Sequence, residues 1–412
     1  MITFSVRERR NSVYKIDTYY KMKTFLKIIV VVIILMTNIM IAKATERPDR
    51  VILFMIDGLH WEAPQKLNMP VLNALKKEGT YVEKSFVIIP HHPTVGDYSK
   101  FNSCSFPNTM LHAGTIFLRP ENRMLQEVFA GKNQTAFVVN VAAYRTVSKG
   151  FTTTIMDPTL NDDQVVAQSI ALLNNQDPIF TRIHLQTPGY LGQAVVAASS
   201  PDKPYYRNIF GKDSPYVVAV ENADKLLGKF INYLKESGKW EHTVLIVTSD
   251  HGQSNLGWHP LFDEDSWVTP FVVVGPGIAK GRELPYLEHT DIAPTIAWLL
   301  GVEAPNKDGG AGKPVKEILQ QYDAENYHPD RSIQTINQQI KEFNFLKARM
   351  ILKSEKQKYF GNIIASLENE ILTPEPFYHQ DRIMDWYKAG STRHMIESNE
   401  KRLKEMRSEL EK

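Results

Sequence analysis

The sequence is poor in cysteine, because Cys104 is the only one among its 412 residues. This excludes an intrachain disulfide, so the fold relies on its hydrophobic core. An excess of charge of one sign is also lacking: 48 basic residues balance 46 acidic ones, and the net charge is +2. Such a balance predicts no nucleic-acid-binding patch and no general attraction to anionic membranes. The 43% hydrophobic and 23% charged residues are typical of a globular protein.

The apolar run at residues 28–41 is short for a membrane span. It has 14 positions, whereas a spanning helix needs about 20. The basic stretch KMKTFLK precedes it and the small-residue stretch AKA follows it, as in a signal peptide. We therefore expect residues 1–44 to be a signal peptide and the mature protein to be exported, either to a periplasm or out of the cell. An uncleaved leader that anchors the chain is the alternative.

Apolar runs alternate with amphipathic stretches after this leader. Strands are predicted at 50–56, 135–141, 178–185, 243–249 and 271–275, and helices at 214–240 and 289–301. Continuous apolar runs suit strands that are buried on both faces of a parallel sheet. The alternation predicts a three-layer α/β/α sandwich with a mostly parallel central sheet for residues 45–320. Residues 321–412 are more charged and helical in period, which predicts a helical C-terminal extension with solvated faces.

Two predicted strands end in residues that bind metals. Asp57 follows the first strand, and Asp250 and His251 follow the fourth. Ligands collect beyond the carboxyl ends of the strands in such sheets, so these side chains are expected to meet. Two carboxylates and an imidazole suit zinc, with manganese, magnesium or calcium as alternatives. Turn formation by Asp57 and helix capping by Asp250 are the structural alternatives.

A candidate nucleophile lies between these two segments. Ser105 precedes Phe106-Pro107, and proline fits the first turn of a helix. The Ser105 hydroxyl would then lie at a helix N-terminus, which favours phosphate or sulfate. A metal ion can lower the pKa of a bound hydroxyl enough to make it a nucleophile. The alternative is that Ser105 only caps the helix.

At these motifs the chain resembles the alkaline phosphatase superfamily. The ordered segments VILFMIDG, SFPN, TSDHG, PFVVVGPGI and HTDIAPTIAWLLG, within residues 50–320, are similar to type I phosphodiesterases/nucleotide pyrophosphatases and sulfatase-like hydrolases. The resemblance implies an alkaline phosphatase-like catalytic domain over residues 45–320. It also implies a metal held by Asp57, Ser105, Asp250 and His251, with Ser105 as covalent nucleophile and a small-molecule phosphate or sulfate ester as substrate. Thr94, Cys104 and Thr109 are the alternative nucleophiles.

The chain departs from the family pattern in two places. Two-zinc phosphodiesterases carry an acidic residue and a histidine in a central loop, but the stretch HLQTPGYLGQ has neither at the expected place. One metal or two therefore remain open. Sulfatases convert Cys or Ser to formylglycine in a C/S-x-P-x-R context, and Thr109 replaces that arginine here. An unmodified serine favours phosphate esters over sulfate esters.

Three further histidines have competing interpretations. His259 is a candidate general acid, with packing against Trp258 as the alternative. His289 is a candidate further metal ligand, with helix capping as the alternative. His184, inside a predicted strand, is interpreted as a buried structural residue. The leading hypothesis is an exported metal-dependent hydrolase of phosphate mono- or diesters; a sulfatase-like hydrolase and a non-catalytic binding protein of the same fold are the alternatives.

Overall fold

The computed structural model describes residues 22, 25–29, 47–87, 124–129, 134–146, 148–260, 262–305, 312–356 and 393–412. The chain divides into two compact units, Met1–Glu46 and Arg47–Lys412. Residues 25–29 of the first unit are helical. No helix in the described part of the chain is both long and apolar enough to cross a bilayer. The second unit contains the sheet and all the elements that follow.

The second unit is built on a mixed, mostly parallel sheet with the order β4-β3-β5-β1-β6-β7-β2-β8, in which β9 also pairs with β2. β1 lies between β5 and β6 and is parallel to both, whereas β7 is antiparallel to β6 and β2. The strands are β1 (Arg50–Ile56), β2 (Thr80–Phe86), β3 (Thr135–Val139), β4 (Thr153–Met156), β5 (Phe180–Leu185), β6 (Thr243–Thr248), β7 (Val268–Val274), β8 (Arg282–Glu283) and β9 (Leu287–Glu288).

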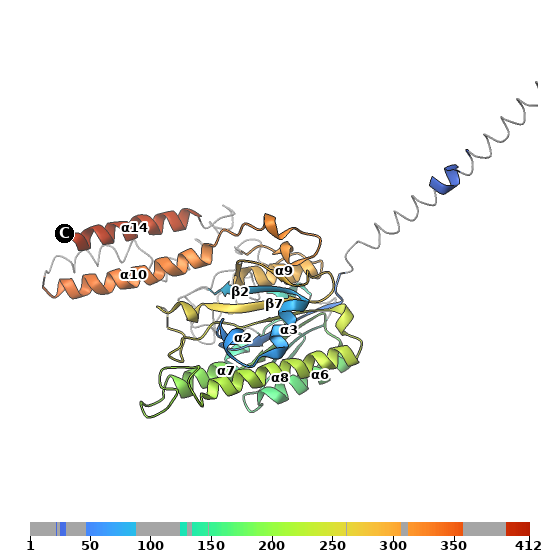
Figure 1. Cartoon of the computed structure of the whole chain (residues 1–412), viewed down its shortest axis with the longest axis horizontal. Helices are drawn as coiled ribbons and strands as arrows, with labels where there is room; N and C mark the ends of the chain where they lie inside the picture. Colours follow the sequence, from blue (N-terminus) through green and yellow to red (C-terminus); the bar gives the residue numbers. More distant parts are fainter. Residues whose placement is uncertain are drawn as a thin grey trace, which may run out of the picture. The chain divides into compact units, whose positions relative to one another are not determined.

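Helices cover both faces of this sheet (Figure 1). One face carries α3 (Pro70–Glu78), α6 (Asp162–Gln176) and α8 (Pro215–Glu236). The other carries α5 (Leu125–Val128) and α9 (Ile292–Leu299). Alternate residues of β1 enter the two hydrophobic cores, Phe54 on the α8 side and Leu53 on the α9 side. The unbroken apolar run of β1 thus reflects burial on both faces, and the predicted three-layer α/β fold is confirmed.

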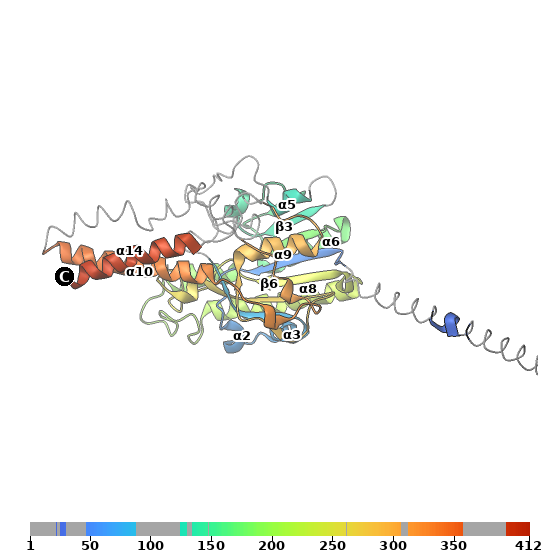
Figure 2. The ribbon, with the colours of Figure 1, turned by 90° about the horizontal axis from the view of Figure 1, so that it is seen from above.

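The C-terminal residues include two helices, α10 (Ser332–Ser354) and α14 (Arg393–Glu411), which lie side by side (Figure 2). Ile333 and Phe343 of α10 share a hydrophobic cluster with Phe86 and Trp267 of the sheet side. The backbone N–H of Ile333 donates to Glu288 Oε1 at 2.8 Å. These contacts fix the first turns of α10 to the region of β9, so the helical pair continues from the sheet domain.

Candidate metal centre

Three neighbouring strands end at the same edge of the sheet, and the candidate site lies there. In the parallel pairing of β1 with β6, Met55 is opposite Thr248. Asp57 therefore leaves β1 beside the point where Asp250 and His251 leave β6. This is the edge where ligands bind in parallel α/β sheets. The predicted convergence of the two segments is thus a direct consequence of strand order and register.

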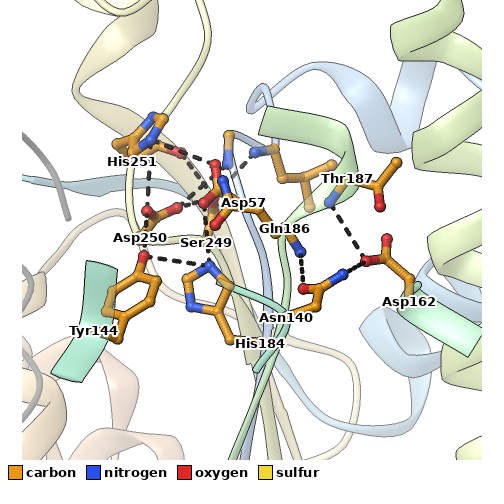
Figure 3. Close-up of polar contacts among 12 residues, drawn as sticks. Asp57, Asn140, Tyr144, Asp162, His184, Gln186, Thr187, Ser249, Asp250 and His251 are labelled. Carbon is orange, nitrogen blue, oxygen red and sulfur yellow. Dashed lines mark hydrogen bonds and ion pairs between the residues drawn. The ribbon is translucent and has the colours of Figure 1, made fainter. Parts of the chain in front are cut away.

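Asp57, Asp250 and His251 form one cluster of potential ligands (Figure 3). One ligand atom from each lies within 4.8 Å of the others. His251 Nε2 is 3.5 Å from Asp57 Oδ1 and 3.5 Å from Asp250 Oδ2. All three residues are buried, with at most 2% of their surface exposed. Buried carboxylates are stable beside cations or metal ions, so this donor set fits a divalent cation.

The hydrogen bonds of His251 leave its inward nitrogen suited to a metal. His251 Nδ1 lies 2.6 Å from the carbonyl oxygen of Gly252. A carbonyl only accepts hydrogen bonds, so Nδ1 carries a proton, and in the neutral ring the lone pair is then on Nε2, which faces the two carboxylates. Ser249 Oγ donates to the carbonyl of His251 at 2.7 Å and holds this turn in place. Histidine ligands in metal sites are oriented in this way by a backbone carbonyl behind the ring.

His184 and Tyr144 hold the two aspartates from behind, and the sequence interpretation missed this role of His184. Arg182 Nη2 lies 3.4 Å from His184 Nδ1. Arginine only donates, so the His184 proton is on Nε2, which donates to Asp57 Oδ2 at 3.1 Å. Burial lowers the pKa of His184 to about 3, which makes this contact a hydrogen bond of a neutral ring and not an ion pair. The Tyr144 hydroxyl donates to Asp250 Oδ2 at 3.2 Å.

Polar side chains clamp the start of the short helix α7 (Thr187–Tyr190), which follows β5. The N–H of Gln186 donates to Asn140 Oδ1 at 3.1 Å, and the N–H of Thr187 donates to Asp162 Oδ1 at 3.4 Å (Figure 3). Asn140 Nδ2 donates to Asp162 Oδ1 at 2.8 Å and joins the two anchors. Burial raises the pKa of Asp162. The clamp therefore fixes where α7 begins relative to the ends of β3 and β5.

The clamped helix brings a glycine against the candidate ligand Asp57. A Cβ added at Gly189 would lie 1.7 Å from Asp57 Oδ1. The backbone of α7 and of the π-helical turn Leu191–Val196 thus occupies space beside the carboxylate. This segment belongs to the stretch where an acidic residue and a histidine are absent from the sequence pattern. At position 189, the lack of a side chain lets the backbone lie directly against Asp57.

His259 lies next to the metal-ligand cluster. Its ring centroid is 4.5 Å from that of His251 in an edge-to-face arrangement. The ring of Trp258 stacks on the His259 ring, with 4.6 Å between the centroids. Both interpretations of the sequence are therefore compatible with the geometry, because His259 packs on Trp258 and also stands beside a candidate ligand. Its role as a general acid stays a prediction.

Two predictions about the site remain, the further ligand His289 and the nucleophile. His289 is outside the cluster, and its Nε2 is 3.1 Å from Ser85 Oγ and 3.0 Å from Thr269 Oγ1, in the buried space between β2 and β7. These contacts give His289 a structural role, and its assignment as a further metal ligand stays a prediction. The predicted nucleophile and its alternatives all lie outside the described residues: Ser105, Thr94, Cys104 and Thr109.

Comparisons with known proteins agree with this fold. Residues 110–302 match the Sulfatase family model. This match covers a little less than half of the chain. The structure of a phosphonate monoester hydrolase of Agrobacterium radiobacter superimposes with a TM-score of 0.55 over 68% of this chain and 79% of that one, at 15% identity, which shows a shared fold. The resemblance to the alkaline phosphatase superfamily is thereby confirmed.

Curated relatives match short segments of the chain. The multifunctional alkaline phosphatase superfamily protein PehA of Trinickia caryophylli is 34% identical over 103 residues, 23% of this chain and 20% of that protein. The choline-sulfatase of Rhizobium meliloti is 29% identical over 125 residues, 27% of this chain and 24% of that protein. The chain thus matches about a quarter or less of the length of either relative. The family model includes Asp250 and His251 but begins after Asp57 and Ser105.

Proposed function

We propose that this protein is a metal-dependent hydrolase of phosphate mono- or diesters that uses Ser105 as its nucleophile. The convergence of Asp57, Asp250 and the lone pair of His251 Nε2 at one buried point carries the proposal. These three donors would hold one divalent cation, with zinc as the first candidate and manganese, magnesium or calcium as alternatives. A bound cation supplies positive charge that favours an ionised hydroxyl and the charge that develops on a phosphoryl group.

The residues around this point have separate tasks in the proposed reaction. Ser105 Oγ forms a bond to phosphorus while the bond from phosphorus to the ester oxygen breaks. His259, beside His251, would give its proton to the departing oxygen, because imidazole titrates near neutral pH. Water then breaks the bond between phosphorus and Ser105 Oγ: its hydroxyl stays on phosphorus, its proton restores the Ser105 hydroxyl, and the product is phosphate from a monoester or a phosphate monoester from a diester. His184 and Tyr144 touch no substrate in this scheme; they position Asp57 and Asp250.

Phosphate esters are proposed ahead of sulfate esters because of the sequence around Ser105. Thr109 stands where the pattern for conversion to formylglycine has arginine, which favours a serine hydroxyl as the reacting group. Hydrolysis of sulfate esters is the second candidate, and the match to the Sulfatase family model favours it. Mass spectrometry of the peptide that contains Ser105 separates the two, since formylglycine differs from serine in mass.

The decisive experiment compares wild type with Ser105→Ala on an aryl phosphate, an aryl phosphate diester and an aryl sulfate, with zinc or manganese added to metal-stripped protein. We expect kcat to fall by at least about 1000-fold in the variant, as for other serine nucleophiles. Ser237→Ala, at the distant end of α8, is the matched control and should keep full activity. Wild-type turnover by Ser105→Ala would refute the nucleophile, and an inert, metal-free wild-type protein would favour a binding protein.

We further propose that the protein acts outside the cytoplasm. The leader-like segment at residues 1–44, with its basic stretch, apolar run and AKA sequence, supports this location. N-terminal sequencing of the protein recovered from cell fractions tests it. A new N-terminus at Thr45 in a soluble exported fraction is expected, and an intact leader in the membrane fraction would indicate an anchor.

A further inference from the structure

A loop beside the candidate metal centre is held in one conformation by its own hydrogen bonds. The N–H of Ser254 donates to the carbonyl of Trp258 at 2.7 Å, and the N–H of Gly257 donates to the carbonyl of Ser254 at 2.8 Å. Ser254 Oγ donates to Asp263 Oδ2. Gly257 has φ +86°, and a Cβ there would lie 2.5 Å from the carbonyl oxygen of Gly192. The loop is thus pressed against the π-helical turn that follows α7.

This loop exposes large apolar side chains although it is well anchored. Leu256 is 42% exposed, Trp258 44% and Phe262 55%. A single exposed apolar residue is ordinary on a protein surface. Three such side chains close together in the sequence are less usual, and exposed apolar area of this kind marks binding sites. Little conformational freedom remains to be lost when a ligand contacts the loop.

A line of stacked rings connects this apolar surface to the metal-ligand cluster. His251 contacts His259 at 4.5 Å between ring centroids, and His259 stacks on Trp258 at 4.6 Å with an interplanar angle of 21°. One face of the Trp258 ring is therefore covered by His259, and the exposed 44% of the residue lies on the rest of its surface. Trp258 is two ring contacts away from a candidate metal ligand. A ring-bearing group on an ester held at that metal needs to span only these two contacts to meet the indole.

We infer that Trp258, with Leu256 and Phe262, forms a subsite for the leaving group of the ester, and that this leaving group carries a ring. The inference rests on the proposed function. A flat ring, either aromatic or a sugar, can cover the free face of an indole, whereas a short linear alkyl chain covers little of it. The loss of stacking and buried area on removal of the indole corresponds to about a tenfold change in binding.

The test uses Trp258→Ala, Trp258→Phe and wild type on three phosphate esters: phenyl phosphate, a hexose 6-phosphate and ethyl phosphate. For each ester, the ratio of variant to wild-type kcat/KM cancels the intrinsic reactivity of that ester. We expect Trp258→Ala to lose about tenfold on at least one ring-bearing ester and less than twofold on ethyl phosphate, and Trp258→Phe to regain part of the loss. A loss of kcat/KM on phenyl phosphate indicates a subsite for an aromatic ring, and a loss on the hexose 6-phosphate indicates a subsite for a sugar. Phe345→Ala, 55% exposed on α10, is the control and should leave all ratios unchanged.

Two outcomes of the kinetic test would overturn the inference. An equal loss on all three esters would mean that Trp258 acts only by supporting His259, and no loss on any ester would mean that the loop does not touch the substrate. If no ester is hydrolysed by wild type, the proposed function fails but the subsite is still tested by binding of phenylphosphonate and methylphosphonate to metal-loaded protein. About tenfold weaker binding of phenylphosphonate alone in Trp258→Ala supports the subsite, and equal binding by variant and wild type refutes it.

Discussion

Replacement of Gly189 by alanine should weaken metal binding by at least about 100-fold without unfolding the protein. Gly189 lies in α7 with a backbone conformation open to alanine, so the substitution tests space and not backbone strain. The added Cβ would lie 1.7 Å from Asp57 Oδ1 and 2.6 Å from Asp57 Cγ. Since the start of α7 is clamped through Asn140 and Asp162, the carboxylate of Asp57 is the group that gives way.

The size of this effect follows from how little the distance between a metal and its ligand can vary. Asp57 Oδ1 must move by more than about 1 Å to relieve the clash, whereas ligand distances in metal sites vary by only about 0.2 Å. Changes outside the ligand shell already weaken metal binding by about 10–100-fold. Loss of one of three ligands should therefore weaken it by at least about 100-fold, which is about 2.7 kcal/mol.

The assay is a titration of metal-stripped protein with zinc, by calorimetry or in competition with a chromophoric chelator. Circular dichroism checks that the variant is folded. Gly228→Ala in α8 is the matched control, because its Cβ would approach only the side chain of Val71, at 3.0 Å, far from Asp57. An affinity of folded Gly189→Ala within about threefold of wild type would refute the assignment of Asp57 as a ligand positioned against α7.

Two further changes probe the surroundings of the site and the domain. His184→Phe removes the hydrogen bond to Asp57 and should weaken zinc binding by about 10–100-fold. His184→Gln keeps a hydrogen-bond donor and should weaken zinc binding less. Equal weakening in the two variants would contradict the positioning role of His184. Burial, followed by the charge of Glu288, raises the pKa of Asp291 well above its usual value, so folding stability should fall as the pH rises from about 4 through that raised pKa. Asp291→Asn should flatten this dependence of the melting temperature on pH above about pH 4, and an unchanged slope would contradict the prediction.

The sequence predicts the parts of the fold that depend on local pattern. The predicted strand at 50–56 coincides with β1, and 243–249 differs from β6 by one residue, because strands buried on both faces leave continuous apolar runs. β2, with the sequence TYVEKSF, was not predicted. It is antiparallel to β7, and its residues Glu83 and Lys84 are only partly buried. These two charged residues interrupt the apolar run by which the other strands were recognised.

The site residues that follow strand ends were predictable from the sequence. The positioning residue His184, which lies within a strand, was not. Asp57, Asp250 and His251 stand directly after apolar runs, so strand order alone brings them together. His184 lies inside β5, and its contact with Asp57 depends on the register of β5 against β1, which no local pattern encodes. A weak signal was present, because Arg182 and His184 alternate along one face of an otherwise apolar strand. Two ionisable groups buried on the same face need a polar partner across the sheet.

The stretch HLQTPGYLGQ, which lacks the acidic residue and the histidine of a second metal site, packs closely against Asp57 and Gln253. Gly189 lets the backbone of α7 approach Asp57, and Gly192 lets the following π-helical turn approach the buried amide of Gln253, which a Cβ would meet at 1.8 Å. A side chain at position 189 would displace Asp57, and one at position 192 would displace Gln253. The segment that departs from the two-metal pattern in sequence is therefore also the one whose backbone packs directly against the candidate ligand Asp57.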